Sequence, residues 1–155
     1  MAVLDIADLS AALPKGAPVA GLDLGEKTIG VAVSDTALMI ASPLELIRRT
    51  KFTQDVQALF GLMDGRGAAG LVIGLPVNMD GGEGPRCQSV RAFARHLLRL
   101  REMPIAFWDE RLSSAAVNRV LISEADISRA RRAELVDKMA AAYILQGALD
   151  RLGAL

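Results

Sequence analysis

The sequence is poor in the residues that carry most nucleophilic and transition-metal chemistry. Among its 155 residues, Cys87 is the only cysteine and His96 the only histidine. A lone cysteine excludes an intramolecular disulfide and a thiolate zinc cluster. A lone histidine removes most zinc sites, catalytic triads and cysteine–histidine pairs. We therefore expect both residues to be structural, and any chemistry to rest on other side chains.

Long apolar runs and an excess of charge are also missing. The chain is 52% hydrophobic, but no uninterrupted apolar run reaches the roughly 18 residues of a transmembrane helix. The first residues carry Asp5 and Asp8 in place of the basic start of a secretory signal. We therefore expect a cytoplasmic protein without a membrane partner. The formal net charge is zero, which argues against a generally basic nucleic-acid binder but is compatible with local basic patches.

Apolar runs and turn residues alternate along the chain in a pattern typical of strands and helices. Pro43 suits an edge strand, and Thr53 is placed to cap a helix. The predicted strands are 19–24, 29–35, 41–49, 71–76 and 105–110, and the predicted helices are 53–63, 86–101, 113–123 and one after a basic connector at 125–134.

The order of these elements predicts the fold class. Three strands form an initial meander, and the later strands alternate with helices. This order predicts an α/β fold with a five-stranded mixed sheet flanked by helices on both faces. The length and the lack of a linker or repeat favour one domain over residues 1–155. Residues 1–17 are expected to form a short extension with one helical turn within 5–12.

Acidic residues occur at positions where strands and helices normally bury apolar side chains. Asp23 interrupts the first strand, Asp109 and Glu110 end the fifth, and Asp137 lies inside the last helix. Helical spacing places Asp137 on one face with four apolar residues: Ala140, Ala141, Ile144 and Ala148. If the first strand is central, with the fourth and fifth beside it, these acids meet at one end of the sheet.

Clustered carboxylates repel one another unless a cation neutralises them. Carboxylate oxygens select Mg²⁺ or Mn²⁺. Two such ions roughly 3.5–4 Å apart can bind the attacking water and the leaving oxygen when a phosphodiester is hydrolysed. The acids therefore predict metal-assisted phosphoryl transfer. Simpler interpretations remain for each acid: Asp23 as a turn residue, Asp109 and Glu110 as exposed charges, and Asp137 as a helix cap.

Four stretches of the sequence resemble, in order, the signature blocks of the YqgF (RuvX) family. They are GLDLGEKTIGVAVSD, VIGLPVNMDGGEGP, WDERLSSAAV and VDKMAAAYILQ, and the resemblance spans about residues 19–150. It implies a ribonuclease H-like fold, similar to that of RuvC-type Holliday junction resolvases. It also implies a Mg²⁺- or Mn²⁺-dependent nuclease that matures 16S rRNA. The block DERLSS has Ser where many members have Thr, which keeps the hydroxyl group.

The family's acids fall on Asp23, Glu110 and Asp137, the residues that the spacing also selects. We expect Asp23 to bridge two metal ions and the other two acids to complete one ion each. Asp109 is the open case. Consecutive strand residues face opposite sides, so only one of Asp109 and Glu110 is expected to point into the site.

Several further residues are candidates for binding the substrate. Gly25 gives backbone clearance or serves a tight turn, and Lys138 either contacts the scissile phosphate or is a solvated charge on the helix. Asn78 and Arg86 lie within the glycine-rich stretch PVNMDGGEGPR, which is either a plain flexible loop or a site whose N–H groups bind a phosphate. Arg91, Arg95 and Arg99 share one helical face, which is either a solvated surface or a track for a nucleic-acid backbone. Trp108 is suited to stacking on a base or to packing in the core.

Nucleic acid is the expected partner, with a structured rRNA precursor favoured over a DNA junction and ribosomal particles as a further partner. Two alternative functions keep the same fold: a resolvase of four-way DNA junctions, and a non-catalytic RNA-binding factor for ribosome assembly. A third alternative is a nucleotide binder, because DLGEKTIGVAVSD also resembles the phosphate-binding hairpin of actin-like kinases. Those proteins use two such domains, for which 155 residues are too few.

Overall fold

A mixed sheet organises the computed structural model, which describes residues 3–112 and 129–155, apart from the side chains of residues 129–138. Within these residues, five strands pair in the order β3-β2-β1-β4-β5. β1 pairs antiparallel with β2 and parallel with β4, and β4 pairs parallel with β5. The strands are β1 (Val19–Leu24), β2 (Thr28–Ser34), β3 (Ala41–Arg48), β4 (Gly70–Leu75) and β5 (Ile105–Asp109). The predicted mixed sheet with a central first strand is confirmed.

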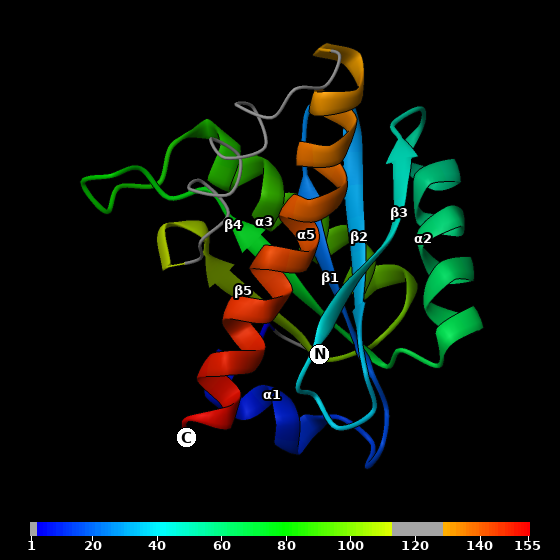
Figure 1. Cartoon of the computed structure of the whole chain (residues 1–155), viewed down its shortest axis with the longest axis vertical. Helices are drawn as coiled ribbons and strands as arrows, with labels where there is room; N and C mark the ends of the chain where they lie inside the picture. The colour runs from blue at the N-terminus through cyan, green and yellow to red at the C-terminus, as the bar shows by residue number, and fades with distance from the viewer. Residues whose placement is uncertain (1–2, 113–128) are drawn as a thin grey trace.

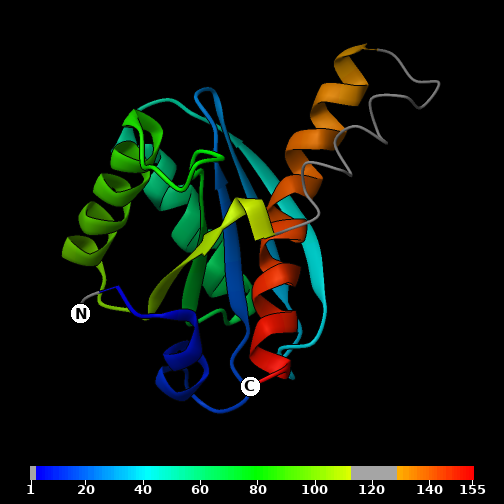
Figure 2. The same cartoon turned by 90° about the vertical axis from the view of Figure 1, so that its left-hand side faces the viewer.

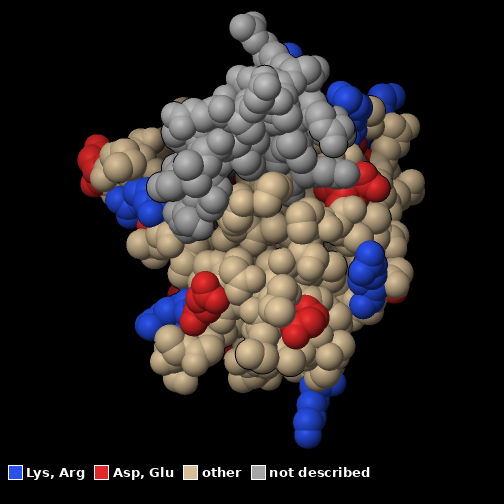
Figure 3. All heavy atoms as spheres, viewed as in Figure 1, with Lys and Arg blue, Asp and Glu red and all other residues tan. Residues whose placement is uncertain are grey.

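Helices cover both faces of this sheet. α2 (Phe52–Arg66) and α3 (Pro85–Leu100) lie on one face, and α5 (Arg129–Gly153) lies on the other. Figure 2 shows the layers nearly edge-on, with the sheet between α3 and α5. The predicted arrangement of helices on both faces is therefore confirmed. On the face that carries α5, basic and acidic side chains are interspersed (Figure 3).

The alternation of side chains along each strand divides the core in two. Leu22, Ile73 and Ile105 pack with residues of α2 and α3, whereas Val72 and Ala106 pack against α5. All residues of β4 are buried, as expected for a strand covered on both faces.

Close approach of α5 to the sheet depends on small residues. A Cβ atom on Gly21 would lie 2.7 Å from Leu145 Cβ and 3.2 Å from the Ala141 carbonyl oxygen. The helix contributes Ala141 at this contact, and Ala141 and Ala148 are both without exposed surface. The last helix therefore packs directly onto the backbone of the central strand.

The N-terminal residues belong to the core beneath α5. α1 (Ile6–Ala12) buries Leu9 completely, and Leu13 is 8% exposed. The Leu4 N–H donates a 2.7 Å hydrogen bond to the Ile105 carbonyl oxygen. The expected helical turn within residues 5–12 is confirmed, and the segment is packed onto β5 and α5 rather than standing apart as an extension.

Several predicted element boundaries are wrong, among them the end of the first long helix, since α2 runs to Arg66 and not to residue 63. Thr53 does not cap α2, which begins at Phe52; instead Thr50 N–H and Oγ1 donate to Asp55 Oδ1 at 3.0 and 3.1 Å. β5 ends at Asp109, because a 3-10 turn, η1 (Glu110–Leu112), begins at Glu110. α5 begins at Arg129, so part of the predicted connector is helical. The predicted helix 113–123 lies outside the described residues.

None of the helices in the described part of the chain combines the length and the apolar character that crossing a membrane requires.

Candidate active site

Asp23 lies near the carboxyl end of the central strand, on the face that carries α5. It is half-buried and pairs with Gly30 across β2. Gly21 faces Leu145 of α5, and residues two apart on a strand share a face. The β1–β4 register pairs Leu22 with Ile73, so the next two residues, Asp23 and Gly74, are neighbours across the strands.

Glu110 reaches the same place from the end of β5. Glu110 begins the 3-10 turn that follows β5, and its side chain lies over β4. A Cβ atom on Gly74 would lie 2.8 Å from Glu110 Oε1, 3.2 Å from Glu110 Cγ and 2.6 Å from Ile144 Cδ1. The Glu110 carboxylate therefore occupies the space that a side chain at position 74 would fill.

Asp23 and Glu110 are thus brought to one end and one face of the sheet. Gly74 neighbours Asp23 in the strand register and contacts Glu110 directly. Adjacent strands lie about 4.8 Å apart, so the two acids flank a single narrow region beneath α5. The N-terminal turns of α5 rise past this end of the sheet (Figure 1).

Asp137 and Lys138 lie in α5, more than a turn after its start at Arg129. Asp137 is one turn before Ala140 and Ala141, which are buried against the sheet. The side chains of Asp137 and Lys138 lie outside the described residues, so their predicted roles stay predictions. Among the described side chains there is no group of three or more His, Cys, Asp or Glu that could hold a metal ion.

Asp109 and Glu110 take different directions, as the alternation argument expects of them. The Asp109 carboxylate accepts hydrogen bonds from Arg111 N–H at 2.9 Å and from Arg111 Nη2 at 2.7 Å. The hydrogen bonds from the Arg111 side chain hold the pKa of Asp109 below its usual value. Asp109 is therefore bound to its own neighbour, and Glu110 is the acid beside Gly74.

The glycine-rich loop after β4 is closed by its own backbone. Asn78 N–H donates to the Gly82 carbonyl oxygen at 2.9 Å, and Gly81 N–H donates back to the Asn78 carbonyl oxygen at 2.9 Å. Gly81 has φ of 89°, which only glycine adopts easily. The Asn78 residue itself is exposed, and Arg111 Nη1 donates to the Met79 carbonyl oxygen at 3.4 Å.

The three helical arginines have different surroundings. Arg91 forms an ion pair with Glu83, with Nε and Nη2 at 2.6 and 2.8 Å from the carboxylate, and its guanidinium lies 5.0 Å from the centre of the Phe107 ring. The hydrogen bond from Arg91 lowers the pKa of Glu83. Arg95 and Arg99 are exposed.

Two arginines hold the turn that follows β1. Gly25 N–H donates to the Thr28 carbonyl oxygen at 2.8 Å. Arg86 Nη2 donates to the Leu24 carbonyl oxygen at 3.3 Å, and Arg49 Nη1 donates to the Gly25 carbonyl oxygen at 2.7 Å. Arg49 was not among the predicted binding residues. The run of basic residues at the end of the third strand, RRTK, was the available signal.

Trp108, Cys87 and His96 have structural surroundings. Trp108 is 8% exposed, and its ring packs on Gly147 of α5, so of the two predicted roles the structure supports core packing. Its Nε1 has no hydrogen-bond partner within the described residues. Cys87 is fully buried, and this burial raises the pKa of its thiol. The His96 ring makes an edge contact with Phe52 at 5.6 Å between ring centres.

Two solved resolvases share this fold. The structure of T. thermophilus RuvC in complex with a Holliday junction substrate superposes with a TM-score of 0.53 at 14% identity, covering 88% of this chain and 96% of RuvC. The yeast mitochondrial Holliday junction resolvase Ydc2 gives a TM-score of 0.50 at 11% identity, covering 96% and 85% of the two chains. The fold is therefore the ribonuclease H-like fold of RuvC-type resolvases, as predicted.

The family is defined by sequence. The model of the RuvX family, described as Holliday junction resolvase, matches residues 17–151, and the chain belongs to this family. Proteins from Phenylobacterium zucineum and Caulobacter vibrioides are 72% and 67% identical to this chain. The alignments cover 98% of both chains for the first and 100% of both for the second, and both proteins are named "Putative pre-16S rRNA nuclease". Family and relatives together indicate a hydrolase that acts on phosphodiester bonds.

Proposed function

We propose that the chain is a metal-dependent endonuclease that acts in the 5′ processing of pre-16S rRNA. In this proposal the whole chain works as one domain in the cytoplasm, on free precursor RNA or on ribosomal particles. The observation that carries the proposal is the meeting of Asp23 and Glu110 beside Gly74. The names of the relatives support the choice of substrate.

The residues beside Gly74 fit hard divalent cations. Asp23 and Glu110 supply carboxylate oxygens, which Mg²⁺ and Mn²⁺ prefer to the nitrogen and sulfur ligands of zinc sites. Asp23, Glu110 and Asp137 would hold two such ions. When bound, such ions lower the pKa of water and neutralise charge that develops on phosphate oxygens.

A second set of residues positions the substrate in this proposal. We assign Lys138 to the scissile phosphate, and Arg86 and the exposed Asn78 to neighbouring phosphates. Gly25 lets the substrate strand approach the backbone of the turn after β1. Arg91 and Arg95 extend this path along α3. Arg95 is exposed, whereas Arg91 must share its guanidinium with Glu83, so Arg95 is the stronger contributor of the two.

The proposal is tested by cleavage of a structured pre-16S rRNA fragment with Mn²⁺. Asp23→Asn and Glu110→Gln should each lower the cleavage rate on the order of a hundredfold or more, because a metal contact is worth several kcal/mol in the transition state. Asp109→Asn is the matched control, since Asp109 is bound to Arg111. Equal cleavage by wild type and Asp23→Asn would point to a contaminating nuclease and end the proposal.

A four-way DNA junction is the necessary competing substrate. The family model is described as a Holliday junction resolvase, and the RuvC structure contains a junction. Preferential cleavage of the junction, abolished by Asp23→Asn, would establish the resolvase function instead. If wild type and Asp23→Asn bind RNA equally and neither cuts, the chain is a non-catalytic RNA-binding factor.

A further inference from the structure

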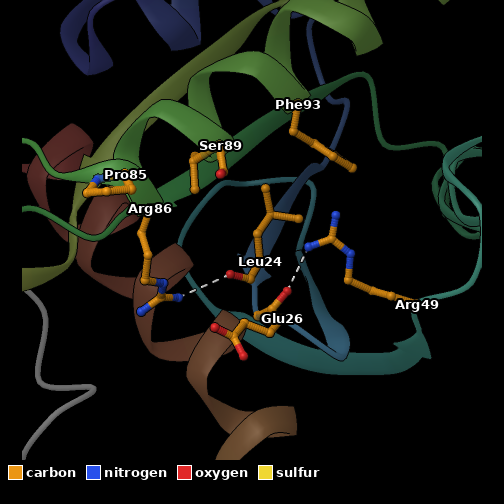
Figure 4. A pocket seen from close by; sticks show the side chains of 9 residues that line it. Leu24, Glu26, Arg49, Pro85, Arg86, Ser89 and Phe93 are labelled. Carbon is orange, nitrogen blue, oxygen red and sulfur yellow. Dashed lines mark hydrogen bonds between the residues drawn. The ribbon is translucent and has the colours of Figure 1, made fainter.

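A cavity of about 310 Å³ opens on the α3 side of the sheet, at the end of β1. Its apolar floor is formed by Leu24, Val90 and Phe93, and its polar wall by Arg49, Arg86 and other residues. In Figure 4 the Leu24 side chain lies between the two arginines, with Ser89 and Phe93 above it. The volume is at the lower end of the range of ligand pockets, about 300–1,000 Å³.

The two arginines are held in place at this cavity. Arg86 and Arg49 each donate to a backbone carbonyl oxygen, of Leu24 and Gly25 respectively. A guanidinium has five N–H donors, so each arginine keeps further donors for a ligand. Glu26 is the acidic residue of the lining, so the two arginines leave a net positive charge. An apolar floor with two fixed cations beside it suits a nucleotide, with its base on the floor and its phosphate between the cations.

A second hollow continues the basic surface around the turn. It has a volume of about 520 Å³ and shares Gly25, Glu26 and Arg86 with the first cavity. It adds Lys27 and Arg48. Cations therefore lie on both sides of the turn after β1, as a path for a phosphate backbone requires.

The cavity lies one residue from the acid of the central strand. Leu24 of the floor follows Asp23 directly, and consecutive strand side chains face opposite sides of a sheet. A nucleic-acid strand that crosses the carboxyl end of β1 therefore meets Asp23 on one face and the cavity on the other. A base can enter such a cavity only when it is unpaired and unstacked.

We propose that this cavity holds one unpaired nucleotide of the substrate strand, adjacent to the phosphodiester that is cut. Its base lies against Leu24, Val90 and Phe93, and its phosphate lies between Arg49 and Arg86. The inference rests on the proposed nuclease function for the identity of the strand, and it makes the cavity a determinant of specificity for single-stranded segments.

The test compares two phenylalanine variants on α3. Ser89→Phe places a ring in the cavity, whereas Gln88→Phe adds the same ring at an exposed neighbouring position outside the lining. Binding is measured by fluorescence anisotropy without divalent metal, in the Asp23→Asn background, with a labelled single-stranded RNA that spans the 5′ processing site. Ser89→Phe should weaken binding about tenfold, which equals about 1.4 kcal/mol, and Gln88→Phe should leave it unchanged. Thermal unfolding verifies that both variants fold.

An abasic scan of the same RNA needs no change to the cavity. In protein with the native cavity, one abasic position beside the cleavage site should weaken binding about tenfold, and abasic positions further away should have little effect. In Ser89→Phe, an abasic nucleotide at that position should no longer weaken RNA binding, because the phenylalanine ring already fills the space of the base. A fully paired duplex should bind Ser89→Phe and Gln88→Phe equally.

The outcomes separate this inference from the nuclease proposal. Cleavage by wild type with no sensitive abasic position, or equal binding by both phenylalanine variants, overturns the cavity assignment and leaves the nuclease intact. In a second outcome, one abasic position weakens binding, Ser89→Phe removes that effect, and wild type never cuts the RNA. This outcome supports the assignment of the cavity and ends the nuclease proposal. Binding of free UMP or AMP that Ser89→Phe abolishes, without an effect on RNA, would make the cavity a mononucleotide site and overturn the inference.

Discussion

Gly74 is the residue on which the spacing of the two described acids depends. Glu110 Oε1 lies 2.8 Å from the position of a Cβ atom on Gly74, and Ile144 Cδ1 lies 2.6 Å from it. Both contacts are shorter than a real Cβ atom tolerates, so any side chain at position 74 must displace the Glu110 carboxylate or Ile144.

Gly74→Ala should therefore reduce cleavage more than it reduces stability. Overpacking of this kind costs about 1–3 kcal/mol of unfolding free energy, which leaves most of a typical domain folded. A displaced Glu110 should lower the cleavage rate at least tenfold, measured with Mn²⁺ on folded protein. Gly61→Ala is the control, since nothing lies within 4 Å of its Cβ position. Unchanged cleavage by Gly74→Ala would show that the position of Glu110 does not matter.

The ion pair of Asp109 and Arg111 predicts a pH dependence of stability. Because Arg111 holds the pKa of Asp109 below its usual value, the pair stabilises the folded state above the ordinary Asp pKa of about 3.9 and is lost as the pH falls through the lowered value. In urea unfolding, wild type should be more stable than Asp109→Asn between pH 5 and 7. The difference should shrink below about pH 4.

Arg111→Gln supplies the comparison for this titration. It should lower stability at neutral pH to a similar extent and return the pKa of Asp109 toward its ordinary range. If the stability difference between wild type and Asp109→Asn is the same at pH 3 and pH 7, the two side chains do not interact in solution.

Residue types and spacing were enough to place part of the site. An acid inside a buried strand and acids at a strand end are costly unless they serve a site, which singles out Asp23 and the pair Asp109 and Glu110. The family resemblance then selects Glu110 of the pair. Arg49 was missed because its role depends on the turn between β1 and β2, which lies 24 residues away in the chain. The role of Gly74 was missed because a missing side chain leaves no pattern in a sequence.

At the scale of elements, the packing of α5 on β5 depends on a glycine inside a helix. A Cβ atom on Gly147 would lie 2.8 Å from Trp108 Nε1 and 3.1 Å from Cε2. The indole is rigid and only 8% exposed, so it cannot turn away easily. Glycine at this position lets α5 lie flat on the ring.

Gly147→Ala should therefore destabilise the protein although alanine favours helices. Helix propensity would add about 1 kcal/mol of stability, but the clash with a buried ring should cost about 1–3 kcal/mol. Gly153→Ala, whose Cβ position has nothing within 4 Å, is the matched control in the same helix. Chemical unfolding of the two variants decides the matter, and equal stabilisation of both would show that α5 does not rest on Trp108.

Element types followed from periodicity, whereas element ends depended on contacts distant from them. The buried run 71–76 and the alternating strands gave the sheet, and β1 matched its predicted bounds. The start of α2 was wrong because the hydrogen bonds between Thr50 and Asp55 place the turn before Thr53. The end of β5 was wrong because Glu110 enters a 3-10 turn that local propensity does not mark.

At the scale of the whole molecule, charge is balanced in number but not in position. The formal net charge is zero, and both signs are interspersed over the α5 face (Figure 3). Around the turn after β1, by contrast, the linings of the two hollows contain four basic residues and one acidic residue, Glu26. The basic residues are Lys27, Arg48, Arg49 and Arg86. Composition alone could not show this local excess, because it is assembled from three separate segments.

The local excess predicts which cations set the salt dependence of RNA binding. Each phosphate contact contributes about 0.7 to the slope of log K against log salt for a single strand. Arg48→Gln should reduce that slope by about this amount, measured by anisotropy over a salt series with single-stranded RNA. Arg101→Gln should leave it unchanged, because Arg101 is bound to Asp64 at 2.8 Å, beyond the other end of α3. Equal reductions by both variants would mean that RNA senses the charge of the whole molecule, and the path around the turn after β1 would have no special role.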